Sequence, residues 1–149
     1  MEVLAPLGPV YQAGTLSGNP LATAAGLAVL ELLTPPAYED LSERAAHLAA
    51  GLERSFQKAA VAAQVPVVGP LMGLFFGDQP VVDYEGAQAS AAGGLYARFF
   101  HAMLARGVAF APGPYEAIFP SLAHSEEDLD HTVKAAAEAA AELADGARR

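Results

Sequence analysis

A helix that is apolar on nearly all sides constrains the fold of this chain more than any other feature. The sequence predicts it over residues 20–33, with Asn19 as a preferred capping residue and Pro20 at the first helical position. It ends before a proline pair, because the residue ahead of a proline is forced out of the helical region. A helix on a protein surface carries a polar face, so this one must be enclosed on most sides. Gly26 at its middle indicates that another backbone comes close there.

The composition indicates that the chain buries part of its surface against something else. Hydrophobic residues make up 53% of the 149 residues. This share predicts a large interface, formed either with a second copy in a homodimer or with a missing N-terminal part of a longer protein. The formal net charge is −9 and the basic residues form no stripe, so we expect no nucleic-acid partner.

Three absences favour a cytoplasmic protein without a metal. The chain has no cysteine, which fits a reducing compartment. Its longest apolar run, 21–33, contains Thr23 and Glu31, is too short to cross a bilayer and follows no basic segment, so we expect no association with a membrane. The four histidines are scattered, without partners at ligand spacing, and predict no metal site.

The rest of the chain predicts an α/β (α+β) fold, in which helices pack on a small, largely antiparallel sheet. Apolar residues at three- and four-residue steps predict helices, and short runs rich in β-branched and aromatic residues predict strands. A brief edge strand is expected over 81–84 and a mobile connector over 85–94. The expected helices are 20–33, 37–63, 95–106 and 125–144, and the expected strand segments are 65–76, 108–111 and 115–119.

The last helix carries the clearest start signal. Ser125 can cap it, three acidic residues follow in the first turn, and Asp128 completes a spacing like that of a capping box. His124, just before the cap, is expected to be a turn and packing residue. Arg148 and Arg149 form a basic tail that we expect to fray.

A glycine-rich loop precedes the apolar helix and is the first candidate site. It reads GPVYQAGTLSGNP over residues 8–20. Gly14 allows close approach of backbone, and Thr15 adds a hydroxyl. Such a loop can cradle a small anion, or it can be a tight turn that feeds the helix. The residues alone favour neither interpretation.

Glu116 is the second candidate. It lies between Tyr115 and an apolar run, next to a Pro-Gly-Pro turn. A carboxylate in such a setting is either satisfied by local donors or held for the amine of a ligand. The residues alone favour the structural interpretation.

Both candidates lie in segments that resemble the glutamate-1-semialdehyde 2,1-aminomutase family of pyridoxal-phosphate enzymes. The segments are GPVYQAGTLSGNP and GVAFAPGPYEAIFPSLAHSEEDLD, which starts at Gly107. The resemblance implies that Gly14 and Thr15 bind the cofactor phosphate of the neighbouring subunit in a homodimer. It also implies that Glu116 lines the active site near the amino groups of a small, amino-acid-derived substrate.

The resemblance covers essentially the whole chain but only the C-terminal third or so of the family's length. It implies the fold of the C-terminal domain of fold-type I pyridoxal-phosphate enzymes, with residues 1–19 as the phosphate loop and its lead-in and 20–149 as a small domain. Met1 would then be an internal methionine. The parent enzyme would convert glutamate-1-semialdehyde to 5-aminolevulinate for tetrapyrrole (porphyrin) biosynthesis.

The chain lacks the family's cofactor-binding core. The only lysines are Lys58 and Lys134. Both occupy polar positions of expected helices, whereas the family's Schiff-base lysine follows a strand and a turn. The fragment alone is therefore expected to be inactive and not to bind the cofactor covalently. Two alternatives remain open, namely a fragment of a related class III aminotransferase or amino-acid racemase, and a non-catalytic interaction module.

Overall fold

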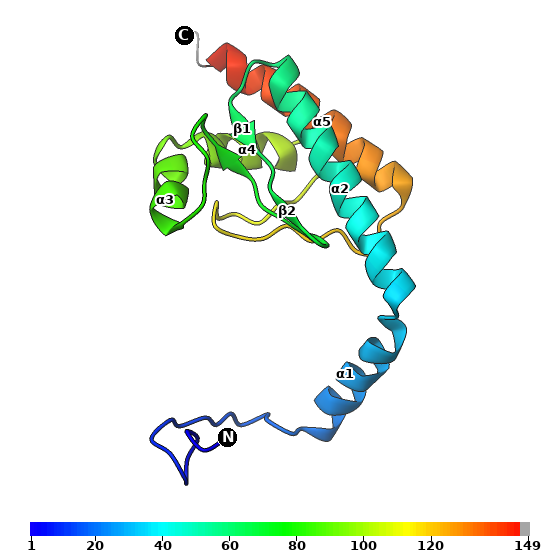
Figure 1. Cartoon of the computed structure of the whole chain (residues 1–149). Helices are drawn as coiled ribbons and strands as arrows, with labels where there is room; N and C mark the ends of the chain where they lie inside the picture. Colours follow the sequence, from blue (N-terminus) through cyan, green and yellow to red (C-terminus); the bar gives the residue numbers. More distant parts are fainter. Residues whose placement is uncertain (147–149) are drawn as a thin grey trace. The chain divides into compact units, whose positions relative to one another are not determined.

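The computed structural model describes residues 1–146 (Figure 1). The basic tail expected at Arg148 and Arg149 lies outside the described residues. The chain divides into two compact units, Met1–Pro35 and a second unit that begins at Pro36. The apolar helix belongs to the first of these units, and the division into residues 1–19 and 20–149 that the resemblance implies stays a prediction.

The N-terminal unit is a loop followed by helix α1, Pro20–Leu32. Asn19 caps the helix as the sequence predicts, because its Oδ1 accepts a hydrogen bond of 3.1 Å from the Ala22 N–H. No residue of α1 is buried, and Leu21 is 83% exposed. Nothing lies within 4 Å of a Cβ added at Gly26. The described chain therefore does not enclose this helix, and its enclosure by a partner stays a prediction.

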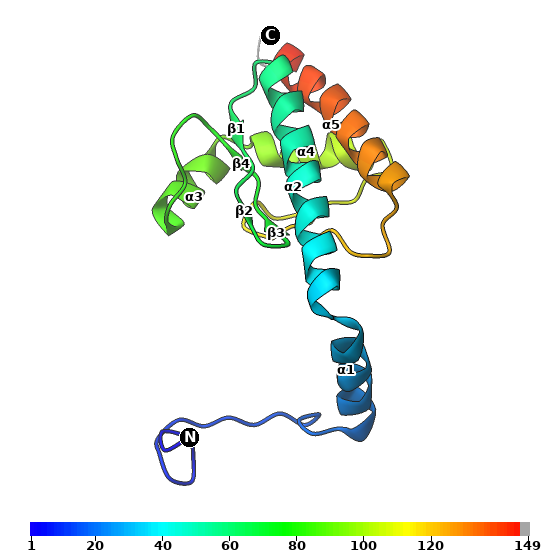
Figure 2. The same cartoon turned by 45° about the vertical axis from the view of Figure 1, so that its right-hand side comes forward.

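The second unit has a helical layer with its own core. Helix α2 (Pro35–Lys58) and helix α5 (Glu126–Gly146) lie side by side, and α4 (Leu95–Leu104) packs behind them (Figures 1 and 2). The two helices approach closely at Gly51 of α2, because a Cβ added there would collide with the side chain of Val133 on α5. The largest fully buried side chains are those of Leu52, Phe56, Leu74, Phe99 and Met103.

The strands pair antiparallel, as predicted, and form two separate two-stranded sheets. Strand β1 (Ala63–Gln64) pairs with β4 (Phe75–Phe76), and β2 (Val67–Val68) pairs with β3 (Leu71–Met72). Phe76 of β4 packs edge-on against Phe56 of α2, with ring centroids 5.3 Å apart. This contact attaches the sheet of β1 and β4 to the helical layer.

Two strand predictions are wrong in whole or in part. Residues 108–111 form no strand, because they run into Pro112 and no neighbouring strand pairs with them. Within 115–119 only Ile118 pairs, in an isolated antiparallel bridge with Met72 of β3.

The segment 81–94 also differs from its prediction. The expected edge strand over 81–84 is absent, and most of the expected connector is helix α3, Tyr84–Ala92. Asp83 starts this helix, since its Oδ1 accepts a hydrogen bond of 2.8 Å from the Gly86 N–H. Residues 84–92 are mostly small and only weakly amphipathic, so their pattern does not signal a helix. The Asp83 cap supplies the local interaction that favours one.

Helix α2 ends at Lys58, five residues earlier than expected, where Ala60 adopts a left-handed conformation with φ of 55°. The start of α5 is as predicted. Ser125 and Asp128 bond reciprocally, with the Ser125 N–H donating to Asp128 Oδ2 at 2.8 Å and the Asp128 N–H donating to Ser125 Oγ at 3.2 Å.

Among the described helices none is by itself long and apolar enough to cross a membrane. Helices α1 and α2 reach that length and composition only when counted together.

Two neighbouring residues of α4 test the core. Met103 is 0% exposed and Leu104 is 49% exposed. We expect Met103→Ala to lower the free energy of unfolding by about 2–5 kcal/mol, since it leaves a cavity. Leu104→Ala, the matched control, should cost less than about 1 kcal/mol. Urea denaturation measures both, and equal losses would contradict this core.

The cap of α5 predicts a dependence on pH. Hydrogen bonds from the backbone N–H and the hydroxyl of Ser125 lower the pKa of Asp128 below its usual value. Because the folded pKa is depressed, its stabilising effect is present above the unfolded pKa and is lost as pH falls through the folded pKa. We expect Ser125→Ala to destabilise the fold at neutral pH and to differ less from wild type in acid. Ser125→Thr should retain the dependence. A loss from Ser125→Ala that is the same at both pH values would contradict this role of Asp128.

Candidate functional site

The first candidate site is a turn that sets up helix α1. The Ser17 N–H donates to the Gly14 carbonyl at 3.0 Å, and the Asn19 N–H donates to the Leu16 carbonyl at 3.0 Å. Gly18 has φ of 75°, a left-handed conformation that glycine adopts without strain. The loop therefore has the geometry of a turn that feeds a helix, and its role as a phosphate site stays a prediction.

The same turn exposes donors suited to a phosphate. Among the described residues, the N–H groups of Gly14, Thr15 and Leu16 and the hydroxyl of Thr15 donate no hydrogen bond, and all three residues are exposed. A Cβ added at Gly14 would lie 2.9 Å from the Ser17 hydroxyl and would crowd it. Residues 1–35 contain no lysine, arginine or histidine. Backbone and hydroxyl donors fit phosphate oxygens. The loop can therefore bind the phosphate group of a cofactor, but it has no lysine that could bind the cofactor covalently.

The second candidate site is the loop that carries Glu116, in the other unit. The buried Tyr96 of α4 donates from its hydroxyl to the Ala111 carbonyl at 2.8 Å, upstream of the loop. Downstream, the Ile118 N–H donates to the Met72 carbonyl at 2.8 Å, and the Met72 N–H donates to the Ile118 carbonyl at 3.0 Å. The loop is thus held at both ends by residues of the core.

Glu116 itself is exposed. Its N–H reaches the Gly113 carbonyl at 3.4 Å, and its side chain folds back so that Oε1 would lie 3.8 Å from a Cβ added at Gly113. Among the described residues, none donates a hydrogen bond or forms an ion pair with the carboxylate. The local donors that the structural interpretation required are therefore not found, and the carboxylate is free to accept from a ligand.

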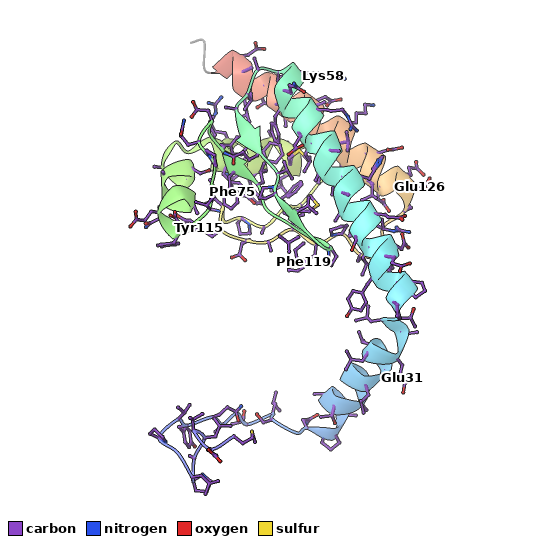
Figure 3. All side chains as sticks on the ribbon, in the orientation of Figure 1. Glu31, Lys58, Phe75, Tyr115, Phe119 and Glu126 are labelled. Atoms are coloured by element: carbon purple, nitrogen blue, oxygen red, sulfur yellow. The ribbon has the colours of Figure 1, made fainter. Side chains whose placement is uncertain are left out.

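An aromatic pair supports the middle of this loop. The ring of Tyr115 lies against that of Tyr84 on α3, with centroids 6.0 Å apart. Figure 3 shows Tyr115 beside α3, with Phe119 farther along the same segment. Helix α3, which the sequence did not predict, therefore forms one side of the loop.

Tyr96 was not among the residues singled out from the sequence. Burial raises the pKa of its hydroxyl, and the negative charge of Glu116 raises that pKa further. The hydroxyl therefore remains a protonated donor at neutral pH. A tyrosine beside the buried stripe of a helix was the available signal, because a buried tyrosine hydroxyl usually has a hydrogen-bond partner.

His124 has the turn role that was expected of it. The Ser121 N–H donates to His124 Nδ1 at 3.0 Å, so this nitrogen is an acceptor and the ring closes a tight turn. Arg44 of α2 donates to the His124 carbonyl and bonds Asp40 through Oδ1 at 2.7 Å. These contacts dock the turn on α2.

The two lysines lie where the sequence placed them. Lys58 and Lys134 are exposed on α2 and α5. Figure 3 shows Lys58 at the C-terminal end of α2, away from Tyr115. Gly14 and Thr15 belong to one unit and Glu116 belongs to the other, so neither unit by itself contains both candidate sites.

Comparison with known proteins identifies relatives along the whole chain. The chain is 49% identical over 150 residues to a glutamate-1-semialdehyde 2,1-aminomutase from Roseiflexus castenholzii, covering 100% of this chain and 34% of the relative. It is 51% identical over 141 residues to one from Sorangium cellulosum, covering 95% of this chain and 32% of the relative. The chain thus spans about a third of the length of the curated relatives it matches.

Solved structures show the same fold. An omega-transaminase from Sphaerobacter thermophilus matches with a TM-score of 0.74 and 26% identity, over 97% of this chain and 33% of that one. A β-phenylalanine aminotransferase from Variovorax paradoxus matches with a TM-score of 0.73 and 31% identity, over 88% of this chain and 30% of that one. The fold is therefore that of a portion of these two aminotransferases.

The family model of the class-III aminotransferases matches residues 1–139. This match includes both candidate sites and all the strands. The chain therefore belongs to the class-III aminotransferase family.

Proposed function

We propose that this chain is part of a glutamate-1-semialdehyde 2,1-aminomutase, which converts glutamate-1-semialdehyde to 5-aminolevulinate for tetrapyrrole biosynthesis. The observation that carries the proposal is the similarity of essentially the whole chain to aminomutases, at 49% and 51% identity. The transaminases of known structure are less similar, at 26% and 31%. This difference favours the aminomutase over the alternative of a related aminotransferase.

In this proposal, the exposed turn holds the phosphate of pyridoxal phosphate. The N–H groups of Gly14 and Thr15 and the Thr15 hydroxyl are the donors. When bound, the cofactor supplies an electron sink for the carbon from which the amino group moves. The lysine that holds the cofactor would come from the remaining two thirds of the enzyme.

The proposed role of Glu116 is to accept a hydrogen bond from a substrate amino group. Its carboxylate is exposed, without a donor among the described residues, and held on a loop fixed at both ends. A hydrogen bond between an ammonium group and a carboxylate is stronger than one between neutral groups. Glu116 can therefore orient the substrate without itself forming a covalent bond.

The chain alone should be inactive. Each donor of the Gly14 turn contributes about 0.5–1.5 kcal/mol net, or up to about 3 kcal/mol toward a charged group. A few such bonds do not hold a cofactor in the orientation that proton transfer needs.

The apolar side chains of α1 should be covered by a second copy, in a homodimer, or by the rest of the enzyme.

A chimera tests this function. In the Roseiflexus castenholzii relative, the matching third is replaced by this chain, and isomerisation of glutamate-1-semialdehyde is measured. We expect the chimera to be active and the 149-residue chain alone to be inactive. Glu116→Gln should lower kcat/KM about 10- to 100-fold, the factor for a hydrogen bond to a charged group. Thr15→Ala should raise the pyridoxal-phosphate concentration needed for half activity.

Two controls make the result specific. Glu53→Gln, an exposed position on α2, should leave the chimera's activity unchanged. A second chimera that carries the matching third of the Sphaerobacter thermophilus omega-transaminase should be inactive. A folded chimera of this chain that binds the cofactor but does not isomerise the substrate would contradict the proposal.

A further inference from the structure

We propose that Tyr96 is a positioning residue that fixes the loop carrying Glu116 through its hydrogen bond to the Ala111 carbonyl. The reaction in which this matters rests on the function proposed above. The positioning itself is a property of the chain. This role would explain why the core contains a tyrosine hydroxyl at a position where a phenylalanine could pack equally well.

The first support is the contrast between the two ends of the Tyr96 side chain. The residue is 5% exposed and belongs to the core cluster, so its ring packs as a phenylalanine would. Its hydroxyl reaches out of this core to the Ala111 carbonyl at 2.8 Å. Burying a hydroxyl costs free energy unless it is bonded. The hydroxyl therefore binds the loop, whereas the ring packs in the core.

The second support is the short span between fixed points. Ala111 is held by Tyr96, and Ile118 is held by two hydrogen bonds to Met72, which is 2% exposed. Only residues 112–117 lie between them, and Pro112 and Pro114 each have a restricted φ. Glu116 is thus confined by anchors on α4 and β3. Without the Tyr96 bond, the upstream end would still be held by packing of the Phe110 ring on Phe99, with centroids 5.7 Å apart, but by no hydrogen bond at Ala111 among the described residues.

The third support is electrostatic. Burial raises the pKa of Tyr96 most, and the negative charge of the Glu116 carboxylate raises it further. The carboxylate therefore lies near the hydroxyl that anchors its loop. A change at either group should be detectable at the other.

The first experiment measures amide hydrogen exchange in the complete 149-residue chain by NMR. Tyr96→Phe keeps the ring and removes the hydroxyl. We expect the Glu116 amide to exchange about 3- to 10-fold faster, the factor for one hydrogen bond of ordinary strength, with unchanged exchange in α2 and α5. Tyr84→Phe is the matched control, since among the described residues its hydroxyl makes no hydrogen bond, and it should leave the Glu116 amide unchanged.

The second experiment is spectroscopic and tests whether the Glu116 carboxylate lies near the Tyr96 hydroxyl in solution. The ring Cζ signal of Tyr96 is followed against pH in ¹³C-labelled chain. We expect Glu116→Gln to move the titration of Tyr96 to lower pH, because it removes a nearby negative charge. Glu53→Gln should not move it.

Equal exchange of the Glu116 amide in the Tyr96→Phe and Tyr84→Phe chains would overturn the inference. So would a Tyr96 titration that Glu116→Gln leaves unchanged. Both measurements use the chain without cofactor or substrate. They therefore decide the positioning role separately from the chimera, whose inactivity would count against the proposed function alone.

Discussion

The helices and strands of the second unit are held together by the packing of three phenylalanine rings. Phe56 of α2, Phe76 of β4 and Phe99 of α4 have ring centroids 5.3–5.7 Å apart. Such tilted and edge-on pairs add about 0.5–1.5 kcal/mol each beyond their buried area. Phe99 also packs on Phe110, directly before Ala111. The same cluster that joins the helical layer to the sheet therefore extends to the base of the Glu116 loop.

The N-terminal unit depends on a different constraint, since it has no comparable core. Helix α1 exposes large apolar side chains on all sides, among them Leu21, Leu27 and Leu30 at 83%, 62% and 64%. Leaving such side chains in water forgoes about 1.5–3 kcal/mol each relative to full burial. The Gly14 turn is therefore attached to a helix that its own chain does not cover. The proposed association would bury this helix.

Local signals in the sequence predicted the parts of the fold that local chemistry determines. Asn19 and Ser125 cap helices in the structure as expected. The wrong predictions concern features that depend on partners distant in sequence. Residues 108–111 have strand composition but no strand to pair with, and the Asp83 cap makes a helix of a segment with little amphipathic pattern. Gly14, Thr15 and Glu116 were noticed from their own chemistry and received their expected roles from a resemblance. The sequence could suggest that the Tyr96 hydroxyl has a partner, but not that this partner is the carbonyl of Ala111, 15 residues away.

The second unit has its own core, whereas the burial of α1 is expected to depend on a partner. Amide hydrogen exchange across the complete chain, measured over a range of concentrations, tests this difference most directly. At low concentration we expect strong protection in α2 and α5 and almost none in α1, because only the first two contribute to a buried core. Protection of α1 should appear as copies associate. Protection of α1 equal to that of α5 in a monomer would contradict the account.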